Sequence, residues 1–88
     1  TGHYAEATNS QQQSERLAHI AKGVTLAKQH GLTVNAGHGL HYHNVAPVAA
    51  IADIYELNIG HAIIAQSVFS GLAGAVADMK AIMQAARR

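Results

Sequence analysis

The tetrad Asn-x-Gly-His occurs twice in this chain, at residues 35–38 and at residues 58–61. Each copy lies at the C-terminal end of a short apolar run that predicts a strand, over 32–36 and over 56–59. The stretches before, between and after these runs carry apolar residues at helical spacing. Strands that alternate with helices pair in parallel through crossover connections. The expected fold class is therefore α/β.

The first helix is predicted from about residue 11 to residue 30, and residues 1–8 before it are expected to form a loop. Ser10 and Gln13 have the spacing of a capping box, in which two side chains bind free amide groups of the first turn. Gly31 supplies the stop, because glycine accepts the left-handed conformation that ends many helices. The positions expected to face the core are Leu17, Ile20, Ala21, Val24 and Ala27.

Three further helices are predicted after the first strand. A short one should follow Asn44 as its cap, a second should run over 62–69, and a long last helix should begin after Ser70. The positions expected to face the core are Val45, Val48, Ala49 and Ile51 in the short helix, and Leu72, Val76, Met79, Ile82 and Met83 in the last one.

The balance of residue types predicts that this chain is part of a larger unit. Hydrophobic residues make up 49% of the 88 residues and charged residues only 12%, against a usual charged share of about 25%. A small free-standing domain needs more polar surface, rather than less. Both predicted strands are also apolar enough to be covered on both faces. We therefore expect residues 1–88 to be the C-terminal portion of one larger α/β domain, and not an independent domain.

Charge and cysteine content exclude several classes of protein. The net charge is +1, and the six Lys and Arg residues are scattered, so no basic stripe is available for a nucleic acid. No apolar run approaches the ~20 residues that cross a bilayer. Cysteine is absent, which removes disulfides and cysteine-ligated zinc sites. We expect no nucleic-acid partner and no membrane partner.

The two tetrads predict a ligand site. The C-terminal ends of parallel strands open onto one face of the sheet, where ligands bind in α/β proteins. This places His38, Gly39, Gly60 and His61 around one mouth. Glycine lets a ligand approach the backbone, and free amide groups at a helix start bind phosphate. The alternative is that the glycines only end the strands and the histidines fill space, but the matching positions of the pair favour a site.

The residues after the second tetrad fit a phosphate site. A strand end, a glycine and a short helix follow one another from residue 56 to residue 69. In (β/α)8 barrels, the loops after the seventh and eighth strands and a short extra helix commonly bind phosphate. On that interpretation, 32–36 is the seventh strand and 56–59 is the eighth.

The three histidines of residues 38–43, His38, His41 and His43, are candidate metal ligands, because neutral imidazole commonly binds metal ions. The chain offers no cysteine, and no carboxylate lies between Glu15 and Asp53. We therefore predict no metal site. His41 and His43 alternate along the loop, so one can contact a ligand while the other is solvated.

Three segments around the tetrads closely resemble the pyridoxine 5′-phosphate synthase family. They are residues 34–40 (VNAGHGL), 42–45 (YHNV) and 56–64 (ELNIGHAII). The opening residues, Thr1-Gly2 and Tyr4-Ala5, also look like the end of that family's sixth barrel strand and the loop beyond it. The resemblance covers essentially the whole chain.

The resemblance implies a fold and a reaction. The fold is a (β/α)8 TIM barrel, of which this chain would supply about the last two strands and their helices. The reaction condenses 1-deoxy-D-xylulose 5-phosphate with 3-amino-2-oxopropyl phosphate into pyridoxine 5′-phosphate, phosphate and water, in vitamin B6 biosynthesis. The family implies a cytoplasmic homo-oligomer with no metal and no organic cofactor.

The resemblance also implies roles for individual residues. His38 corresponds to a catalytic proton donor, while Gly39, Gly60 and His61 correspond to substrate-binding residues. The family's other catalytic residues come from earlier strands, so the 88-residue chain alone is expected to be inactive. Two alternatives remain: another TIM-barrel enzyme that acts on a phosphorylated small molecule, and a histidine-rich metal-binding module without enzymatic activity.

Overall fold

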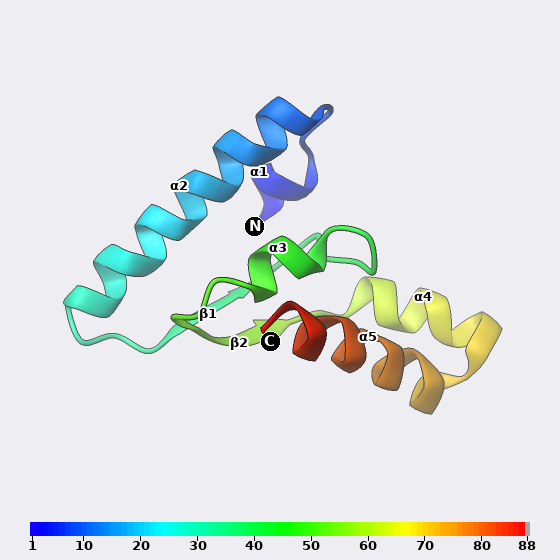
Figure 1. Ribbon diagram of the computed structural model, residues 1–88. Helices are drawn as coiled ribbons and strands as arrows, with labels where there is room; N and C mark the ends of the chain where they lie inside the picture. The colour runs from blue at the N-terminus through cyan, green and yellow to red at the C-terminus, as the bar shows by residue number, and fades with distance from the viewer. Residues whose placement is uncertain (88) are drawn as a thin grey trace.

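The computed structural model describes residues 1–87 and has seven helices and strands within them (Figure 1). In chain order they are α1 (Gly2–Ala5), α2 (Ser10–Gln29), β1 (Val34–Gly37), α3 (Val45–Ala49), β2 (Ile54–Asn58), α4 (His61–Ser70) and α5 (Leu72–Ala86). The α/β fold class predicted from the alternating pattern is therefore confirmed. Among these residues, no helix has both the length and the apolar composition that a membrane crossing requires.

The two strands pair in parallel, as expected, but with an irregular register. Val34 lies opposite Ile54, and the next residue of β1, Asn35, lies opposite Glu56. Tyr55 is therefore an extra residue in β2, which makes a β-bulge. β2 begins at Ile54 instead of residue 56, because the bulge breaks the alternation by which a strand is recognised in sequence. β1 begins at Val34 instead of residue 32.

The bulge brings Ile54 and Leu57, three residues apart in β2, onto the same face of the sheet. Val34, Ala36, Ile54 and Leu57 all pack against the hydrophobic core. Figure 1 shows α3 and α5 in front of the strands, and their Val45, Val48 and Met79 belong to the same core. The opposite face carries the polar side chains Asn35, Glu56 and Asn58, which are exposed. Helices of residues 1–87 therefore cover one face of the strands and leave the second uncovered, and the expectation that both faces are covered in a larger domain stays a prediction.

The predicted start of α2 is one residue too late, while its end is confirmed. Asn9 is the cap, and its side-chain oxygen accepts a hydrogen bond from the amide of Gln12 at 2.8 Å. At the other end, Gly31 adopts a φ of 76°. The amide of Leu32 then donates to the carbonyl of Ala27 at 3.1 Å, which closes the helix as a Schellman motif.

The predicted core positions of α2 and α3 are confirmed with two exceptions, but two of those in α5 are wrong. Val24, Val45, Val48 and Ala49 are buried, and Leu17, Ile20 and Ile51 pack against the core. The two exceptions are Ala21 and Ala27, which are half-buried and lie outside the core. In α5 the buried residues are Ala75 and Met79, and Leu72 is 56% exposed and Val76 38% exposed. Apolar residues occur on several sides of this helix, so periodicity could not select the one that faces the core. Its N-cap is Gly71, with a φ of 79°, and not Ser70.

Candidate functional site

A cleft of about 480 Å³ opens beyond the C-terminal ends of β1 and β2. All four residues predicted to surround a ligand, His38, Gly39, Gly60 and His61, line it. The other lining residues are Leu40, His41, Asn58, Ile59 and Ala62. The sequence prediction that the two tetrads meet at one site is therefore matched by the geometry.

The two tetrads are not at the same height in the sheet. Gly37, the third residue of the first tetrad, lies opposite Asn58, the first residue of the second. The second tetrad is therefore displaced by two residues along the strand direction, or roughly 7 Å at about 3.3 Å per residue. His38 and His61 consequently enter the cleft from different levels.

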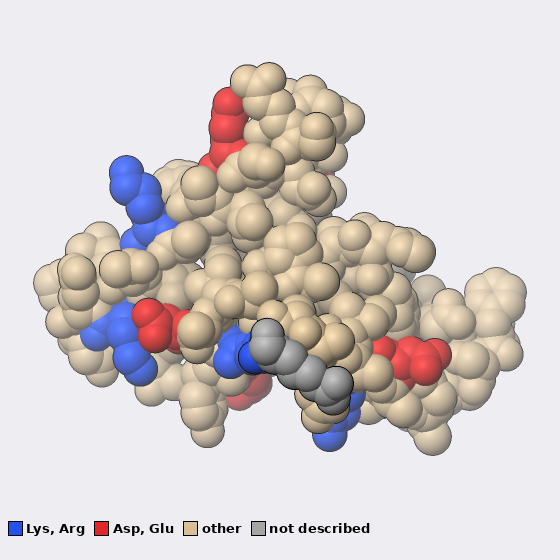
Figure 2. Space-filling view, in the orientation of Figure 1, with Lys and Arg blue, Asp and Glu red and all other residues tan. Residues whose placement is uncertain are grey.

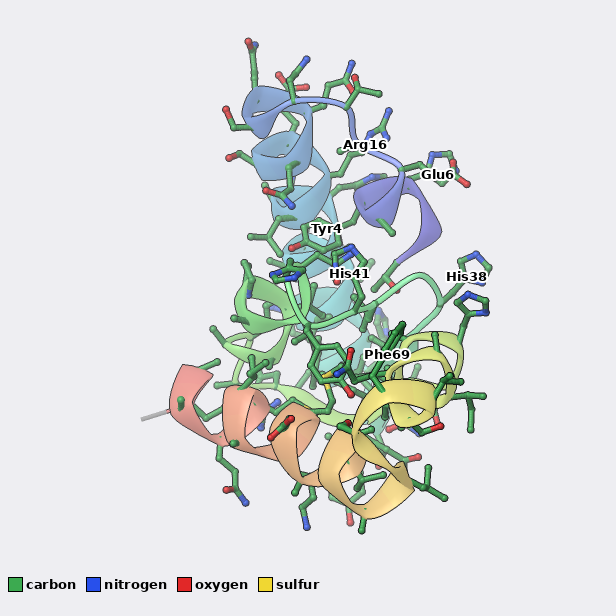
Figure 3. The ribbon with its side chains drawn as sticks, turned by 90° about the vertical axis from the view of Figure 1, so that its right-hand side faces the viewer. Tyr4, Glu6, Arg16, His38, His41 and Phe69 are labelled. Carbon is green, nitrogen blue, oxygen red and sulfur yellow. The ribbon has the colours of Figure 1, made fainter. Side chains whose placement is uncertain are left out.

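His38 has an unusual backbone conformation. Its φ is 79°, and it is the one non-glycine residue with a positive φ among residues 1–87. The left-handed conformation costs an L-residue with a Cβ about 1–2 kcal/mol, so the surrounding structure must hold it in place. Its side chain is exposed, and Figure 3 shows it projecting to the side of the molecule away from α3 and α5. The imidazole is therefore accessible to a ligand.

Two glycines of this region are required by close contacts. A Cβ on Gly37 would lie 2.7 Å from the backbone oxygen of Asn58, so the strands can approach here only because Gly37 lacks one. A Cβ on Gly39, whose φ is 74°, would lie 2.5 Å from the Cβ of Ala5. Gly60 differs, because a Cβ there would meet nothing within 4 Å among the described residues. Its bare backbone is open to the cleft.

The N-terminus of α4 borders the cleft. The helix begins at His61 with Gly60 as its N-cap, and no side chain caps it. The first amide groups of a helix have no acceptor within the helix, and they carry a partial positive charge from the helix dipole. The amides around Gly60 and His61 are therefore suited to an anionic group such as a phosphate ester.

The loop between Gly39 and α3 is held by a buried asparagine. Asn44 is 4% exposed; its side-chain oxygen accepts from the amide of His41 at 2.6 Å, and its side-chain nitrogen donates to the carbonyl of Gly39 at 3.0 Å. The hydroxyl of Tyr4 donates to the backbone carbonyl of Asn44, and burial raises the pKa of Tyr4. Asn44 stands at the predicted cap position, but its side chain stabilises this loop instead of the helix end.

The histidine pair of this loop is arranged so that one member faces the cleft. His41 lines it, whereas His43 is not among the lining residues. The amide of His43 donates to Nδ1 of His41 at 3.1 Å, and the rings stand edge to face with centroids 6.0 Å apart. Within residues 1–87, no three metal-ligating side chains come together.

Tyr42, between the two histidines, joins the loop to α5. Its hydroxyl donates to the carbonyl of Ala75 at 2.7 Å. Partial burial, and to a smaller extent the carboxylate of Asp78, raises the pKa of Tyr42. The loop that carries His38 and His41 is thus attached to the helical layer at its far end.

Charged side chains contribute little to the surface seen in Figure 2. On that face, Lys and Arg lie singly among Asp, Glu and uncharged residues, without a basic stripe. The described residues that line the cleft include neither Lys nor Arg, and its polar groups are backbone amides, histidines and Asn58. An anion in the cleft would therefore be bound by dipoles and imidazoles.

The sequence matches the family described as "Pyridoxal phosphate biosynthesis protein PdxJ" over residues 1–85. It is also similar to a curated pyridoxine 5′-phosphate synthase of Pseudoalteromonas translucida (strain TAC 125), with 60% identity over 87 residues. That match includes 99% of this chain, and the chain spans 36% of the relative's length. The family match runs through both tetrads and every residue that lines the cleft, so the chain belongs to the PdxJ family of pyridoxal phosphate biosynthesis proteins.

Proposed function

We propose that this chain is the C-terminal portion of a (β/α)8 barrel that acts as a pyridoxine 5′-phosphate synthase. The reaction would be the condensation of 1-deoxy-D-xylulose 5-phosphate with 3-amino-2-oxopropyl phosphate, as the family membership and the named relative suggest. The observation that carries the proposal is the cleft, which combines an exposed imidazole with an uncapped helix N-terminus at the ends of parallel strands.

The two faces of the sheet support the barrel. The core face is covered by helices, as the outside of a barrel sheet is, and the other face carries Asn35, Glu56 and Asn58. In a barrel this polar face would turn toward the interior, beneath the substrate. The remaining strands would come from other parts of the enzyme.

We propose a cytoplasmic homo-oligomer that needs no metal and no organic cofactor.

In this proposal four of the cleft residues act on the substrate. His38 is the proton donor, because ring closure and loss of water require proton transfers, and histidine is the side chain that most often serves as general acid or base. Gly39, Gly60 and His61 bind substrate. The amides around Gly60 and His61 would bind the phosphate group of one substrate at the start of α4.

Replacing Gly60 with Val tests the phosphate site without disturbing the described fold. The new side chain meets nothing within 4 Å of its Cβ, but it would stand between a phosphate and the amides. Loss of a hydrogen bond to a charged group costs about 1.5–3 kcal/mol. We therefore expect the KM of one phosphorylated substrate to rise about 10–100-fold in steady-state assays of the full-length enzyme.

Gly23→Val is the matched control, because a Cβ on Gly23 in α2 also meets nothing within 4 Å. It should leave both KM values unchanged. If Gly60→Val also leaves both KM values unchanged, the phosphate assignment is wrong. If the full-length enzyme converts another phosphorylated compound and makes no pyridoxine 5′-phosphate, the alternative barrel enzyme is the better interpretation.

A further inference from the structure

The N-terminal segment, residues 1–5, contacts the loop that carries His38 at both of its ends. At the beginning of the loop, the Thr1 hydroxyl lies within hydrogen-bond distance of the carbonyl oxygens of Gly37 and His38. At the far end, the Tyr4 hydroxyl donates to the carbonyl of Asn44. These contacts join residues far apart in the sequence, so no local sequence pattern predicts them.

The position of the Thr1 hydroxyl matters because of the backbone of His38. The backbone conformation of a residue is set by two dihedral angles, φ and ψ. These angles orient the two peptide planes on either side of its Cα. The carbonyl of Gly37 belongs to the first plane and the carbonyl of His38 to the second. The Thr1 hydroxyl has one hydrogen, so it donates to one of these oxygens at a time. Either bond joins Thr1 to a peptide plane next to the left-handed Cα of His38.

Gly2 determines the space available to the imidazole of His38. A Cβ on Gly2 would lie 3.1 Å from Cδ2 of His38 and 3.6 Å from its Nε2. The edge of the ring thus lies close to the backbone of Gly2, and a Cβ there would push the ring by a few tenths of an ångström. Thr1 contacts the backbone of His38, and Gly2 leaves the space that its ring occupies.

The segment is itself anchored to the rest of the fold. Tyr4 is 1% exposed and belongs to the hydrophobic core. The Arg16 guanidinium, on α2, donates to the carbonyl of His3. Figure 3 shows Arg16 close to the N-terminal helix, with His38 on the same side of the molecule. Residues 1–5 can therefore act as a fixed support for the loop.

We propose that Thr1 and Gly2 are positioning residues for His38, which hold its imidazole in one orientation toward the cleft. This inference rests on the proposed function, in which His38 donates a proton to the reacting substrate. A small misplacement of a catalytic group lowers the rate of the chemical step more than it weakens substrate binding. The two residues should therefore influence kcat and leave KM nearly unchanged.

The test uses the full-length enzyme with Thr1→Val, which keeps the shape and loses the hydroxyl, and Thr1→Ser, which keeps the hydroxyl. We expect Thr1→Val to lower kcat about 10–100-fold, with both KM values within about twofold of the unmodified enzyme. Thr1→Ser should restore kcat to within about threefold. Gly2→Ala should give the same loss of kcat by displacing the ring, and it serves as the second variant if Thr1→Val does not fold.

Thr8→Val is the matched control, because the Thr8 hydroxyl also makes a hydrogen bond, to Gln12, but lies away from the cleft. It should not change kcat.

NMR spectra of the His38 ring supply a measurement independent of activity. The ring signals should move in Thr1→Val and Gly2→Ala, and return in Thr1→Ser.

The outcomes separate this inference from the proposed function. If the unmodified enzyme makes no pyridoxine 5′-phosphate, the proposed function fails, and the ring signals alone decide whether Thr1 and Gly2 position His38. Unchanged ring signals and an unchanged kcat in folded Thr1→Val and Gly2→Ala overturn the inference. A loss in Thr1→Val that Thr1→Ser does not restore overturns the role of the hydroxyl.

Discussion

Replacing His38 with Asn in the full-length enzyme is expected to lower kcat by about 10²–10⁴-fold, the usual contribution of one general acid or base. Asn cannot donate a catalytic proton near neutral pH, although it keeps a polar side chain of similar reach. It also tolerates the left-handed conformation better than most residues, so the φ of 79° at this position should be retained. Substrate binding should change much less than kcat.

The measurement is a comparison of kcat, KM and the unfolding midpoint for His38→Asn and for His30→Asn. His30 is an exposed histidine at the end of α2, outside the cleft, and its replacement should change none of the three. A histidine that only fills space would give a lower unfolding midpoint with kcat almost intact. A kcat within about threefold of the unmodified enzyme would exclude His38 as the proton donor.

The largest loss of stability is expected for Ile54→Ala. Ile54 is 1% exposed and packs in the core between the sheet and its covering helices. Removing most of a buried aliphatic side chain costs about 2–5 kcal/mol, from lost burial and from the cavity left behind. The same residue pairs with Val34 at the end of the strands away from the cleft, and it precedes the bulge that brings Ile54 and Leu57 onto one face.

Ile54→Val is the matched control, since it removes one methylene and is expected to cost only about 0.5–1.5 kcal/mol. Urea unfolding of both variants, at one fixed concentration of the full-length enzyme, measures the difference. Equal midpoints for the two variants would show that Ile54 is not a core residue. Truncating Glu56, on the exposed polar face of the same strand, would remove no comparable apolar burial and should not lower the stability in this way.

Some of the fold could be predicted from sequence because its causes are local. The end of α2 was predicted from the glycine that follows its last turn, and its buried side from the helical spacing of Leu17, Ile20 and Val24. Both signals involve residues only a few positions apart. The alternation of helices and strands identified the fold class for the same reason. The two tetrads also predicted the position of the cleft, because the C-terminal ends of parallel strands open onto one face of the sheet.

The predictions were wrong where the outcome depended on strand pairing, helix packing or backbone geometry, which the sequence pattern does not contain. A bulge at Tyr55 depends on how β2 fits β1, so the alternation inside β2 could not reveal its start. In α5, apolar residues on several sides left the buried face undecided until the helix packed against α3 and α4. At α2, Asn9 and Ser10 are both good caps, and only the backbone geometry selects Asn9.

The candidate site divides in the same way. The sequence alone determined that His38, Gly39, Gly60 and His61 reach the cleft, because each follows the end of a strand. It did not identify Asn58 or Leu40, which also line the cleft. Only the tertiary structure decided how His38 is held. Its left-handed backbone contacts the hydroxyl of Thr1, and its ring occupies the space beside Gly2, more than thirty residues away. A conformation that is unfavourable for the residue itself needs support from outside its own segment, and that support exists only once the chain has folded.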